Sequence, residues 1–566
     1  MDPARAGTAG VKQALKRWAF RLLDVEPEAV IVSFWSGDPA LSRRMLREVR
    51  ELLPERRHYL VTTDPAAEYE GFTVIRVHDG SSLPLEVLHA FRRLRVGLAP
   101  VLFDGEPHPL RAAAFALTPN RVLAYNRNLE RHHLQLSTPA ASLLFWRGVP
   151  LDRIYLRPSW LWPWKRDRTV IPNDVYVAEG RACDPRRRRV GILSPYFPYP
   201  LTHGGAVRIY HLIREAARDF DVVLFAFAKD PALQEFGPLL EVCAKVVAVA
   251  PPRYREPRWS TLRPPEAGEF DSPVMRGLLE REPALELLQV EYTQLASYRG
   301  DLLVEHDLTQ DLYRQVYDRD RTVGAWWNWR RWRLFENRAL RRFPGVIVMS
   351  EKDASMARGS RRVRVIPNGV DLERFTPTPE PPARRILFVG SFNHFPNLVA
   401  FRFFRDQVWP RVRSRVPNAE WTVVAGRDHR LYWRQFTGVD LEADASVRMH
   451  DFVRDVQPLY AEANLVIVPT LVSAGTNLKV LEAMAMGRAI VSTTCGCAGL
   501  GLEHGRTIWI ADEASAFADG VERLLEDPAE RARLAARARL LAEQQFDWRA
   551  IGRVQKKVWE EMLARK

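Results

Sequence analysis

The chain has 566 residues, of which 27% are charged and 46% hydrophobic, values typical of a globular protein with about three domains. Its four cysteines (Cys183, Cys243, Cys495 and Cys497) are too few for a disulfide scaffold and fit a reducing cytoplasm. We expect no signal peptide in Met1–Phe20 and no membrane-spanning helix, because no run approaches about 18 uncharged apolar residues. The net charge of +14, without a nucleic-acid-binding motif, favours a membrane surface or a phosphate-bearing substrate over RNA or DNA.

Residues 1–180 form a predicted N-terminal α/β domain. Apolar runs such as Ala29–Trp35 alternate with amphipathic segments such as Pro39–Leu53, a pattern typical of a parallel, Rossmann-like sheet covered by helices. Ser36, Gly37 and Asp38 follow the first strand, where such folds bind ligands. An ordinary turn from strand to helix is the alternative interpretation of these three residues.

Two segments combine tryptophan with basic residues. The arm at 145–168 holds four Trp among Arg, Lys and Pro, and its prolines exclude a regular helix. A second segment, Ala325–Phe343, is predicted to be a basic, aromatic helix. Each indicates either binding to the headgroup region of a membrane or aromatic packing inside the protein, and the sequence leaves both interpretations open.

Two further α/β domains are predicted after residue 180. The first, 188–375, opens with the strand Val190–Ser194 and a helix that follows Gly204 and Gly205. The second, 384–540, opens with the strand Ile386–Gly390, and a proline-rich stretch before it is a predicted linker. Residues 541–566 are predicted to be a C-terminal helix.

The most informative motif lies at residues 464–490. A buried strand is predicted over Asn464–Pro469, a loop of small residues over 473–477, and a helix after the loop. Backbone NH groups of Gly475, Thr476 and Asn477 can bind phosphate at this helix N-terminus.

Two charged side chains follow on the same predicted helix. Glu482 lies roughly 9 Å along the helix from the loop, which is about the distance from a diphosphate to the ribose of one nucleotide. Lys479 is on the same face and can reach the diphosphate. The motif therefore predicts a pocket for a nucleotide diphosphate.

The residues at 481–501, LEAMAMGRAIVSTTCGCAGLG, resemble the donor-site signature of retaining GT-B glycosyltransferases of the family 4, or group 1, type. Three other segments are similar to motifs of that family in the same order: 191–216, 365–375 and 386–397. The resemblance covers roughly residues 188–560. It implies two Rossmann-like domains facing a cleft, plus an additional N-terminal Rossmann-like α/β domain, and a C-terminal helix that packs back on the acceptor-side domain, 188–375.

The resemblance also implies roles for individual residues. Glu482 would bind the ribose, and His306 would lie in the cleft near the transferred sugar, so these two are the candidate catalytic residues. The donor would also contact Gly204, Gly205, Gly390, Ser391, Arg427, Gly475, Thr476, Asn477 and Lys479. We expect no cofactor beyond the nucleotide-diphosphate sugar, which is the donor substrate.

The sequence departs from the family pattern at two places. The first acid of the Glu-x7-Glu motif is replaced by Ala474, which leaves the identity of the sugar open. The Arg and Lys of the first loop in the nucleotide domain are also absent, and Arg427 and Lys479 are the candidate replacements. No metal-ligand cluster is recognisable, so we expect a metal-independent reaction.

The sequence as a whole predicts a glycosyltransferase that retains the configuration of the transferred sugar, acting in surface polysaccharide or glycolipid assembly. Its partners would be a nucleotide-sugar donor, a carbohydrate or lipid-linked acceptor and a peripheral membrane surface, without nucleic acid. We expect it in the cytoplasm or on the inner face of the membrane. The alternatives are a degenerate GT-B protein that binds nucleotide sugar without turnover, and a GT-B-fold epimerase.

Overall fold

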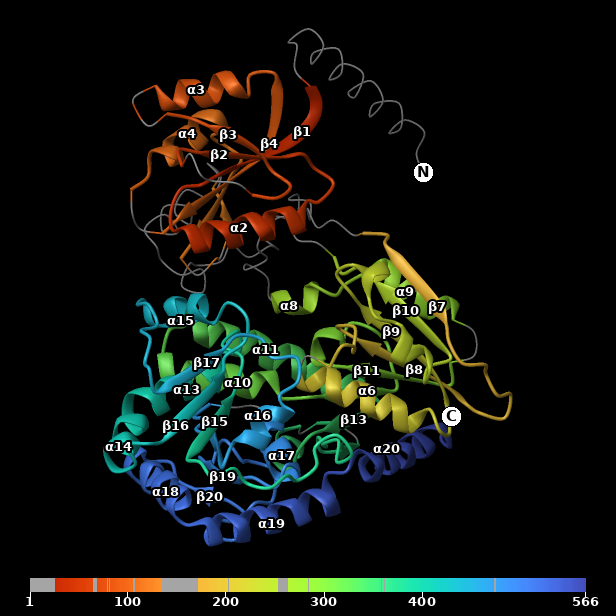
Figure 1. Ribbon diagram of the computed structural model, residues 1–566. Helices are drawn as coiled ribbons and strands as arrows, with labels where there is room; N and C mark the ends of the chain where they lie inside the picture. The colour runs from red at the N-terminus through yellow and green to blue at the C-terminus, as the bar shows by residue number, and fades with distance from the viewer. Residues whose placement is uncertain are drawn as a thin grey trace. The chain divides into compact units, whose positions relative to one another are not determined.

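The computed structural model describes residues 26–566 except 65–68, 79, 81, 105–106, 128, 130, 135–171, 202, 253–262, 283–284, 358, 361 and 473–474. The arm at 145–168 and Ala474 therefore lie outside the described residues. The chain divides into two compact units (Figure 1). Described residues 26–134 belong to unit 1, and described residues from 172 to the C-terminus belong to unit 2.

Unit 1 is built on a six-stranded sheet with the order β3-β2-β1-β4-β5-β6. Strands β1 to β5 are parallel and β6 is antiparallel to β5. The strands are β1 (Glu26–Phe34), β2 (His58–Thr62), β3 (Thr73–Arg76), β4 (Leu94–Phe103), β5 (Val122–Asn126) and β6 (Arg131–His133). The helices are α2 (Pro39–Leu52), α3 (Leu83–Ala90) and α4 (Pro109–Leu117). The Rossmann-like α/β fold predicted for this domain is confirmed.

The turn from β1 to α2 is filled by side chains of unit 1 itself. The backbone NH of Asp38, at the N-terminus of α2, donates to Oδ2 of Asp104 at 2.8 Å. Nη2 of Arg111 donates to the other carboxylate oxygen at 2.6 Å. A Cβ on Gly37 would lie 2.2 Å from Oδ2 of Asp104, so the carboxylate lies directly against this turn. Asp104 therefore occupies the place where related folds bind an anion.

The first sheet of unit 2 has eight strands in the order β14-β13-β12-β11-β8-β9-β10-β7. All pair in parallel except β7, which is antiparallel to β10. The strands are β7 (Val175–Glu179), β8 (Arg189–Ser194), β9 (Asp221–Phe227), β10 (Lys245–Val249), β11 (Leu287–Glu291), β12 (Leu302–Glu305), β13 (Gly345–Val348) and β14 (Val363–Val365). The prediction placed β7 in the N-terminal domain, 1–180. This is wrong, because β7 hydrogen-bonds to β10 in the eight-stranded sheet of unit 2.

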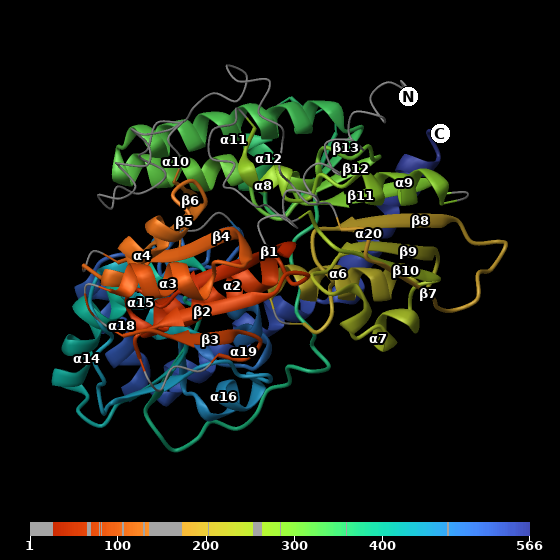
Figure 2. The same ribbon diagram turned by 90° about the horizontal axis from the view of Figure 1, so that it is seen from above.

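Most helices of this half come between its strands in the order of the chain, and the C-terminal helix packs against the same half. They are α6 (Gly204–Ala216), α7 (Gly237–Leu240), α8 (Pro265–Gly268), α9 (Pro273–Arg281), α10 (Thr309–Asp320), α11 (Val323–Arg342), α12 (Glu351–Met356) and α20 (Trp548–Leu563). Helices α10 and α11 run side by side (Figure 2). Helix α11 buries Trp332, as the packing interpretation predicts, and leaves Trp326 exposed by 41%, so contact of this helix with a membrane stays a prediction.

The second sheet of unit 2 has six parallel strands in the order β17-β16-β15-β18-β19-β20. The strands are β15 (Arg385–Val389), β16 (Glu420–Val424), β17 (Val447–His450), β18 (Leu465–Val468), β19 (Ala489–Ser492) and β20 (Trp509–Ile510). The helices are α13 (Phe395–Phe403), α14 (Trp409–Arg415), α15 (His429–Thr437), α16 (Gln457–Glu462), α17 (Leu478–Ala485), α18 (Ala514–Glu526) and α19 (Pro528–Gln545). Strands β15, β18 and β19 are buried almost throughout, as continuous apolar runs between two helical layers require.

Two segments pass between the halves of unit 2 and lie side by side: the first is residues 366–370, and the second contains Asp547 and leads into α20. Val370 pairs with Asp547 in an isolated β-bridge, and α20 then packs on α6 and β11 of the first half. Arg208 of α6 fixes the first segment: its guanidinium donates to the carbonyl oxygens of Ile366 and Pro367 and to Oδ1 of Asn368, at 2.7 to 3.1 Å. The first segment and helix α20 are therefore both held by α6.

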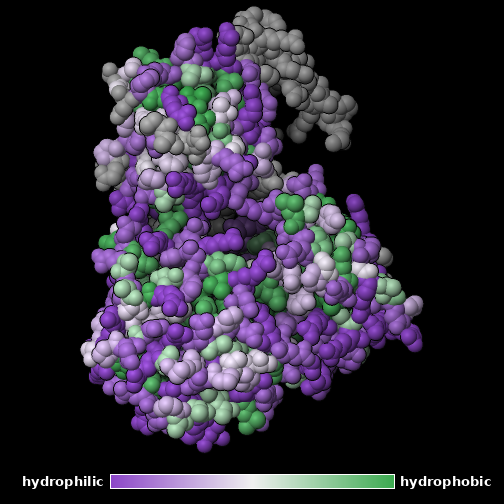
Figure 3. Space-filling model, viewed as in Figure 1, coloured by the Kyte–Doolittle hydropathy of each residue, from purple (hydrophilic) through white to green (hydrophobic). Residues whose placement is uncertain are grey.

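The surface is largely hydrophilic on the face drawn in Figure 3, in keeping with the charged composition. Within the described residues, no helix combines the length and apolar character needed to cross a membrane.

Candidate functional site

The predicted donor half of the site is built on α17, which begins directly after the loop that follows β18. Glu482 is on the second turn of this helix and accepts a hydrogen bond from the hydroxyl of Tyr460 at 2.8 Å. Burial raises the pKa of Glu482, and the Tyr460 hydrogen bond opposes this shift. The carboxyl group is thus held in one orientation by a buried tyrosine, as a group that accepts hydrogen bonds from a diol should be.

Lys479 connects α17 to α13 and, through Asn397, to the loop that follows β15. Its Nζ donates to Oδ1 of Asn397 at 2.8 Å, and Nδ2 of Asn397 donates to the carbonyl oxygen of Ser391 at 3.0 Å. A Cβ on Gly390 would lie 2.8 Å from the Asn397 amide, so this glycine lets the amide pack against the backbone. The structure therefore brings Gly390, Ser391 and Lys479 together.

The other residues that were predicted to contact the donor lie around this cluster. Asn477 donates its side-chain amide to the carbonyl oxygen of Gly496 at 2.9 Å and makes no side-chain cap to α17. Thr476 precedes it and is partly exposed. Arg427 follows Gly426, which packs on Ser391, but its guanidinium is 4.9 Å from the ring centre of Phe452 and is exposed. The structure places Arg427 near the same sheet edge, in contact with an aromatic ring.

The two halves of unit 2 meet at small residues. A Cβ on Gly204, the first residue of α6, would be 2.8 Å from Cδ1 of Leu478, the first residue of α17. A Cβ on Gly475 would be 3.4 Å from the carbonyl oxygen of His306 and from Cβ of Asp307. The N-termini of two helices therefore lie close together, beside the backbone of His306. Helix N-termini carry partial positive charge and favour an anion, whereas the Asp307 carboxyl group, with Oδ2 3.7 Å from the place of a Gly475 Cβ, opposes one.

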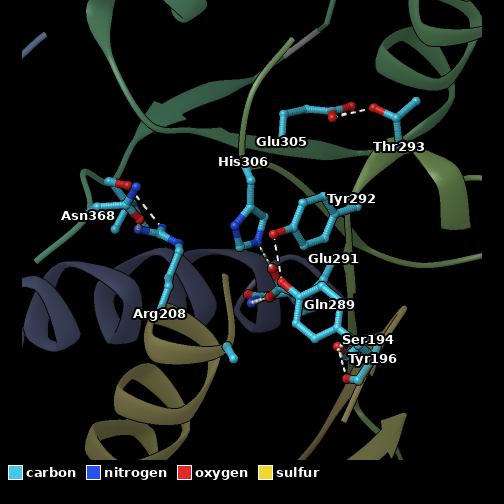
Figure 4. Close-up of polar contacts among 12 residues, drawn as sticks. Ser194, Tyr196, Arg208, Gln289, Glu291, Tyr292, Thr293, Glu305, His306 and Asn368 are labelled. Atoms are coloured by element: carbon cyan, nitrogen blue, oxygen red, sulfur yellow. Dashed lines mark hydrogen bonds and ion pairs between the residues drawn. The ribbon is translucent and has the colours of Figure 1, made fainter. Parts of the chain in front are cut away.

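His306 lies between a carboxylate and an aromatic ring (Figure 4). Its Nε2 is 2.7 Å from Oε2 of Glu291, and its ring stacks on that of Tyr292 with the centroids 3.8 Å apart. Burial lowers the pKa of His306, and the nearby Glu291 carboxylate opposes this effect. The neutral imidazole is therefore the main form at pH 7.

Tyr292 has a strained backbone. Its φ of 67° is in the left-handed region, which is costly for a bulky residue. Its hydroxyl is 2.6 Å from that of Tyr196, and both hydroxyls crowd Gly205, where a Cβ would be 1.9 Å from one and 2.1 Å from the other. Glycine at position 205 therefore allows two tyrosines to reach the N-terminus of α6.

Several buried polar residues of the site were not predicted from the sequence. Gln289, Glu291 and Arg208 are each at most 2% exposed. A signal did exist for the first two: they interrupt an otherwise apolar strand, and a buried polar residue needs a partner. Asp307, whose pKa burial raises to about 6, is the next residue after His306.

A separate pair of buried acids contains Glu305, the last residue of β12, and Glu336 of α11. The hydroxyl of Thr293 hydrogen-bonds to the carboxyl groups of both Glu305 and Glu336, and Glu336 also accepts from the backbone NH groups of Thr309 and Gln310. Burial raises the pKa of Glu336 to about 8 and that of Glu305 well above its ordinary value. At neutral pH this pair therefore holds at least one proton. Over the described part of the chain, no group of three His, Cys, Asp or Glu residues is arranged to hold a metal ion.

We expect Gly205→Ala to lower the free energy of unfolding by about 1–3 kcal/mol, because the new methyl group overlaps both tyrosine hydroxyls. Chemical denaturation of the full-length protein, followed by tryptophan fluorescence, measures the change in the free energy of unfolding. The triple variant with Tyr196→Phe and Tyr292→Phe removes both hydroxyls and should recover part of the loss. Equal stability of Gly205→Ala and the wild type would contradict the crowding described for this position.

Comparison with known proteins agrees with this architecture. Residues 383–527 match the family described as glycosyl transferases group 1. A relative from Mycolicibacterium hassiacum, an MMP alpha-(1->4)-mannosyltransferase, is 27% identical over 285 residues, 46% of this chain and 65% of that protein. A D-inositol 3-phosphate glycosyltransferase from Pseudarthrobacter chlorophenolicus is 30% identical over 205 residues, 32% of this chain and 46% of that protein. The chain thus spans less than two thirds of the length of these relatives.

Among solved structures, a sucrose-phosphate synthase from Thermosynechococcus elongatus superposes with a TM-score of 0.53 at 18% identity, covering 67% of this chain and all of that one. This likeness concerns the fold. Residues 383–527 are thus similar to the glycosyl transferases group 1 family, and the chain combines a GT-B fold with an additional Rossmann-like domain at its N-terminal end.

Proposed function

We propose that this chain is a glycosyltransferase that moves a sugar from a nucleotide-diphosphate sugar to an acceptor with retention of configuration and without a metal ion. The observation that carries the proposal is the junction of α6 and α17, where Gly204 packs on Leu478. The two helix N-termini would stabilise the charge that develops on the departing diphosphate, which is usually the largest catalytic term.

The residues around the junction have separate roles in this proposal. Lys479 and the backbone NH groups of Gly475, Thr476 and Asn477 would bind the diphosphate. Glu482, oriented by Tyr460, would accept hydrogen bonds from the ribose hydroxyls. His306 would contact the transferred sugar from the opposite half. Retention and a role in surface polysaccharide or glycolipid assembly are supported by the resemblance of the donor-site motif. Assays with different nucleotide sugars identify the sugar and the base.

Incubation with UDP-, GDP- and ADP-sugars should release nucleoside diphosphate with at least one donor. We expect Glu482→Ala and His306→Ala to reduce this release by at least about 100-fold, because each removes a group that touches the donor. Glu526→Ala, an exposed acid on α18, is the matched control and should keep the wild-type rate. Binding of a nucleotide sugar without release would favour the degenerate binding protein, and isomerised nucleotide sugar would favour the epimerase.

The affinity for nucleoside diphosphate should fall as the pH rises through about 8. Burial lowers the pKa of Lys479 to about 8, so above this pH the free protein loses the charge that pairs with the phosphates. Binding must then take up a proton, and Kd rises by up to about tenfold per pH unit. Calorimetric titration between about pH 7 and 9.5 measures this. In Lys479→Arg, whose cation does not titrate in this range, the same curve should be flat; a wild-type curve that is equally flat argues against the role of Lys479.

We also propose a peripheral contact with an anionic membrane, supported by α11, where the exposed Arg330 and Arg333 lie over the rings of Trp326 and Trp329. Trp326 is 41% exposed and Leu334 is 63% exposed. Such a face suits the headgroup region. Vesicles containing phosphatidylglycerol should float the wild type and lose a variant with Trp326→Ser, Arg330→Glu and Arg333→Glu. The control Arg411→Glu with Arg430→Glu has the same change of charge on other exposed helices. Equal loss in both variants would indicate a general charge effect and not a contact through α11.

A further inference from the structure

A line of four buried polar groups leads from the C-terminal helix to His306. Nε1 of Trp559, on α20, is 2.8 Å from Oε1 of Gln289. Nε2 of Gln289 is 2.6 Å from Oε1 of Glu291, and Oε2 of Glu291 is 2.7 Å from Nε2 of His306. Figure 4 shows Gln289 and Glu291, both on β11, pointing toward the imidazole.

The chemistry of Trp559 fixes the direction of every hydrogen bond in this line. The indole NH can only donate, so the atom of Gln289 that faces it must be the amide oxygen. The amide NH2 of Gln289 therefore faces Glu291 and donates to the first carboxylate oxygen. The second carboxylate oxygen then accepts from His306, which requires the proton of the imidazole to be on Nε2.

This arrangement determines what His306 can offer a substrate. With the proton on Nε2 and the ring neutral, Nδ1 has a free lone pair and acts as an acceptor. Among the described residues, none hydrogen-bonds Nδ1 of His306. The ring cannot turn easily, because Tyr292 stacks on it with an interplanar angle of 7°.

We propose that Glu291 is a positioning residue that, oriented by Gln289 and Trp559, keeps the proton of His306 on Nε2 and so presents Nδ1 as an acceptor for a hydroxyl group of the sugar substrate. This inference rests on the proposed function for the role of the hydroxyl, although the position of the proton does not depend on turnover. It makes α20 part of the support of the site, because the line begins on that helix.

The substitution Glu291→Gln tests the proposal with almost no change of shape. Gln289 still presents its NH2 group, so the oxygen of the new amide should face Gln289. The new NH2 group then faces His306 and forces Nε2 to be an acceptor, which moves the proton to Nδ1. The hydroxyl of the substrate would meet an NH group in place of a lone pair.

Nitrogen NMR of the full-length protein labelled with ¹⁵N-histidine reads the proton position directly, with His306→Ala to assign the signal. We expect the proton on Nε2 in the wild type and on Nδ1 in Glu291→Gln, together with a fall of at least about tenfold in kcat/KM, which corresponds to about 1.4 kcal/mol. A wild-type His306 with its proton on Nδ1, or a Glu291→Gln variant with an unchanged proton position, overturns the proposal.

Two further variants separate this role from a general effect on folding. Glu305→Gln changes another buried carboxyl group, adjacent to His306 in sequence and bonded to Thr293, and should leave the proton of His306 on Nε2. Trp559→Phe keeps an aromatic ring but removes the indole NH, so in the Glu291→Gln background Gln289 can turn over and return part of the proton to Nε2. If the wild type releases no nucleoside diphosphate but the proton of His306 moves from Nε2 to Nδ1 in Glu291→Gln, the proposed function is contradicted and the positioning role of Glu291 is not.

Discussion

The close approach of two helix N-termini is the constraint on which the site depends. Helices α6 and α17 begin at Gly204 and Leu478, and a side chain at position 204 would collide with Leu478. Two positive helix ends repel each other unless an anion or solvent lies near both. The arrangement is therefore most favourable when a doubly charged group such as a diphosphate is bound. It also explains why small residues gather here, since Gly475 approaches the backbone of His306 in the same way.

The polar groups behind this junction have a cost that the surrounding core must offset. Gln289, Glu291 and His306 are buried, and a buried polar group is tolerated only when its hydrogen bonds are made. Trp559 completes the line from the far end of the chain, which makes the C-terminal helix a structural requirement of the first half of unit 2. The strained φ of Tyr292 belongs to the same region, where packing against His306 and Tyr196 holds a conformation that the isolated residue would avoid.

The sequence predicted the architecture well because its signals are local. Apolar runs such as Val190–Ser194 and Asn464–Pro469 became strands within a residue of their expected bounds, and the predicted α/β fold is confirmed. The small-residue loop before α17 and the pair Lys479 and Glu482 were also visible, since helical spacing places them on one face. Their roles in binding stay predictions.

Other features could not be predicted, because they depend on contacts between distant parts of the chain. Gln289 and Trp559 are separated by 270 residues, and nothing in either segment names the other. Strand β7 was assigned to the wrong domain, since an edge strand carries no signal for the sheet it joins. The hydrogen bond from Lys479 to Asn397 on α13 was also not predicted. The sequence showed only that the loop around Ser391 lacks the Arg and Lys of the family pattern.

The internal carboxylate of unit 1 has a consequence for how the whole chain responds to nucleotides. Asp104 already neutralises the start of α2, with Arg111 as its counterion, so unit 1 needs no dissolved anion to complete its structure. In the proposed function, the helix ends at Gly204 and Leu478 of unit 2 bind the diphosphate instead. Mass action then stabilises only the unit that binds, and in a calorimetric scan added nucleotide should separate the two melting transitions by moving the one that belongs to unit 2 to higher temperature.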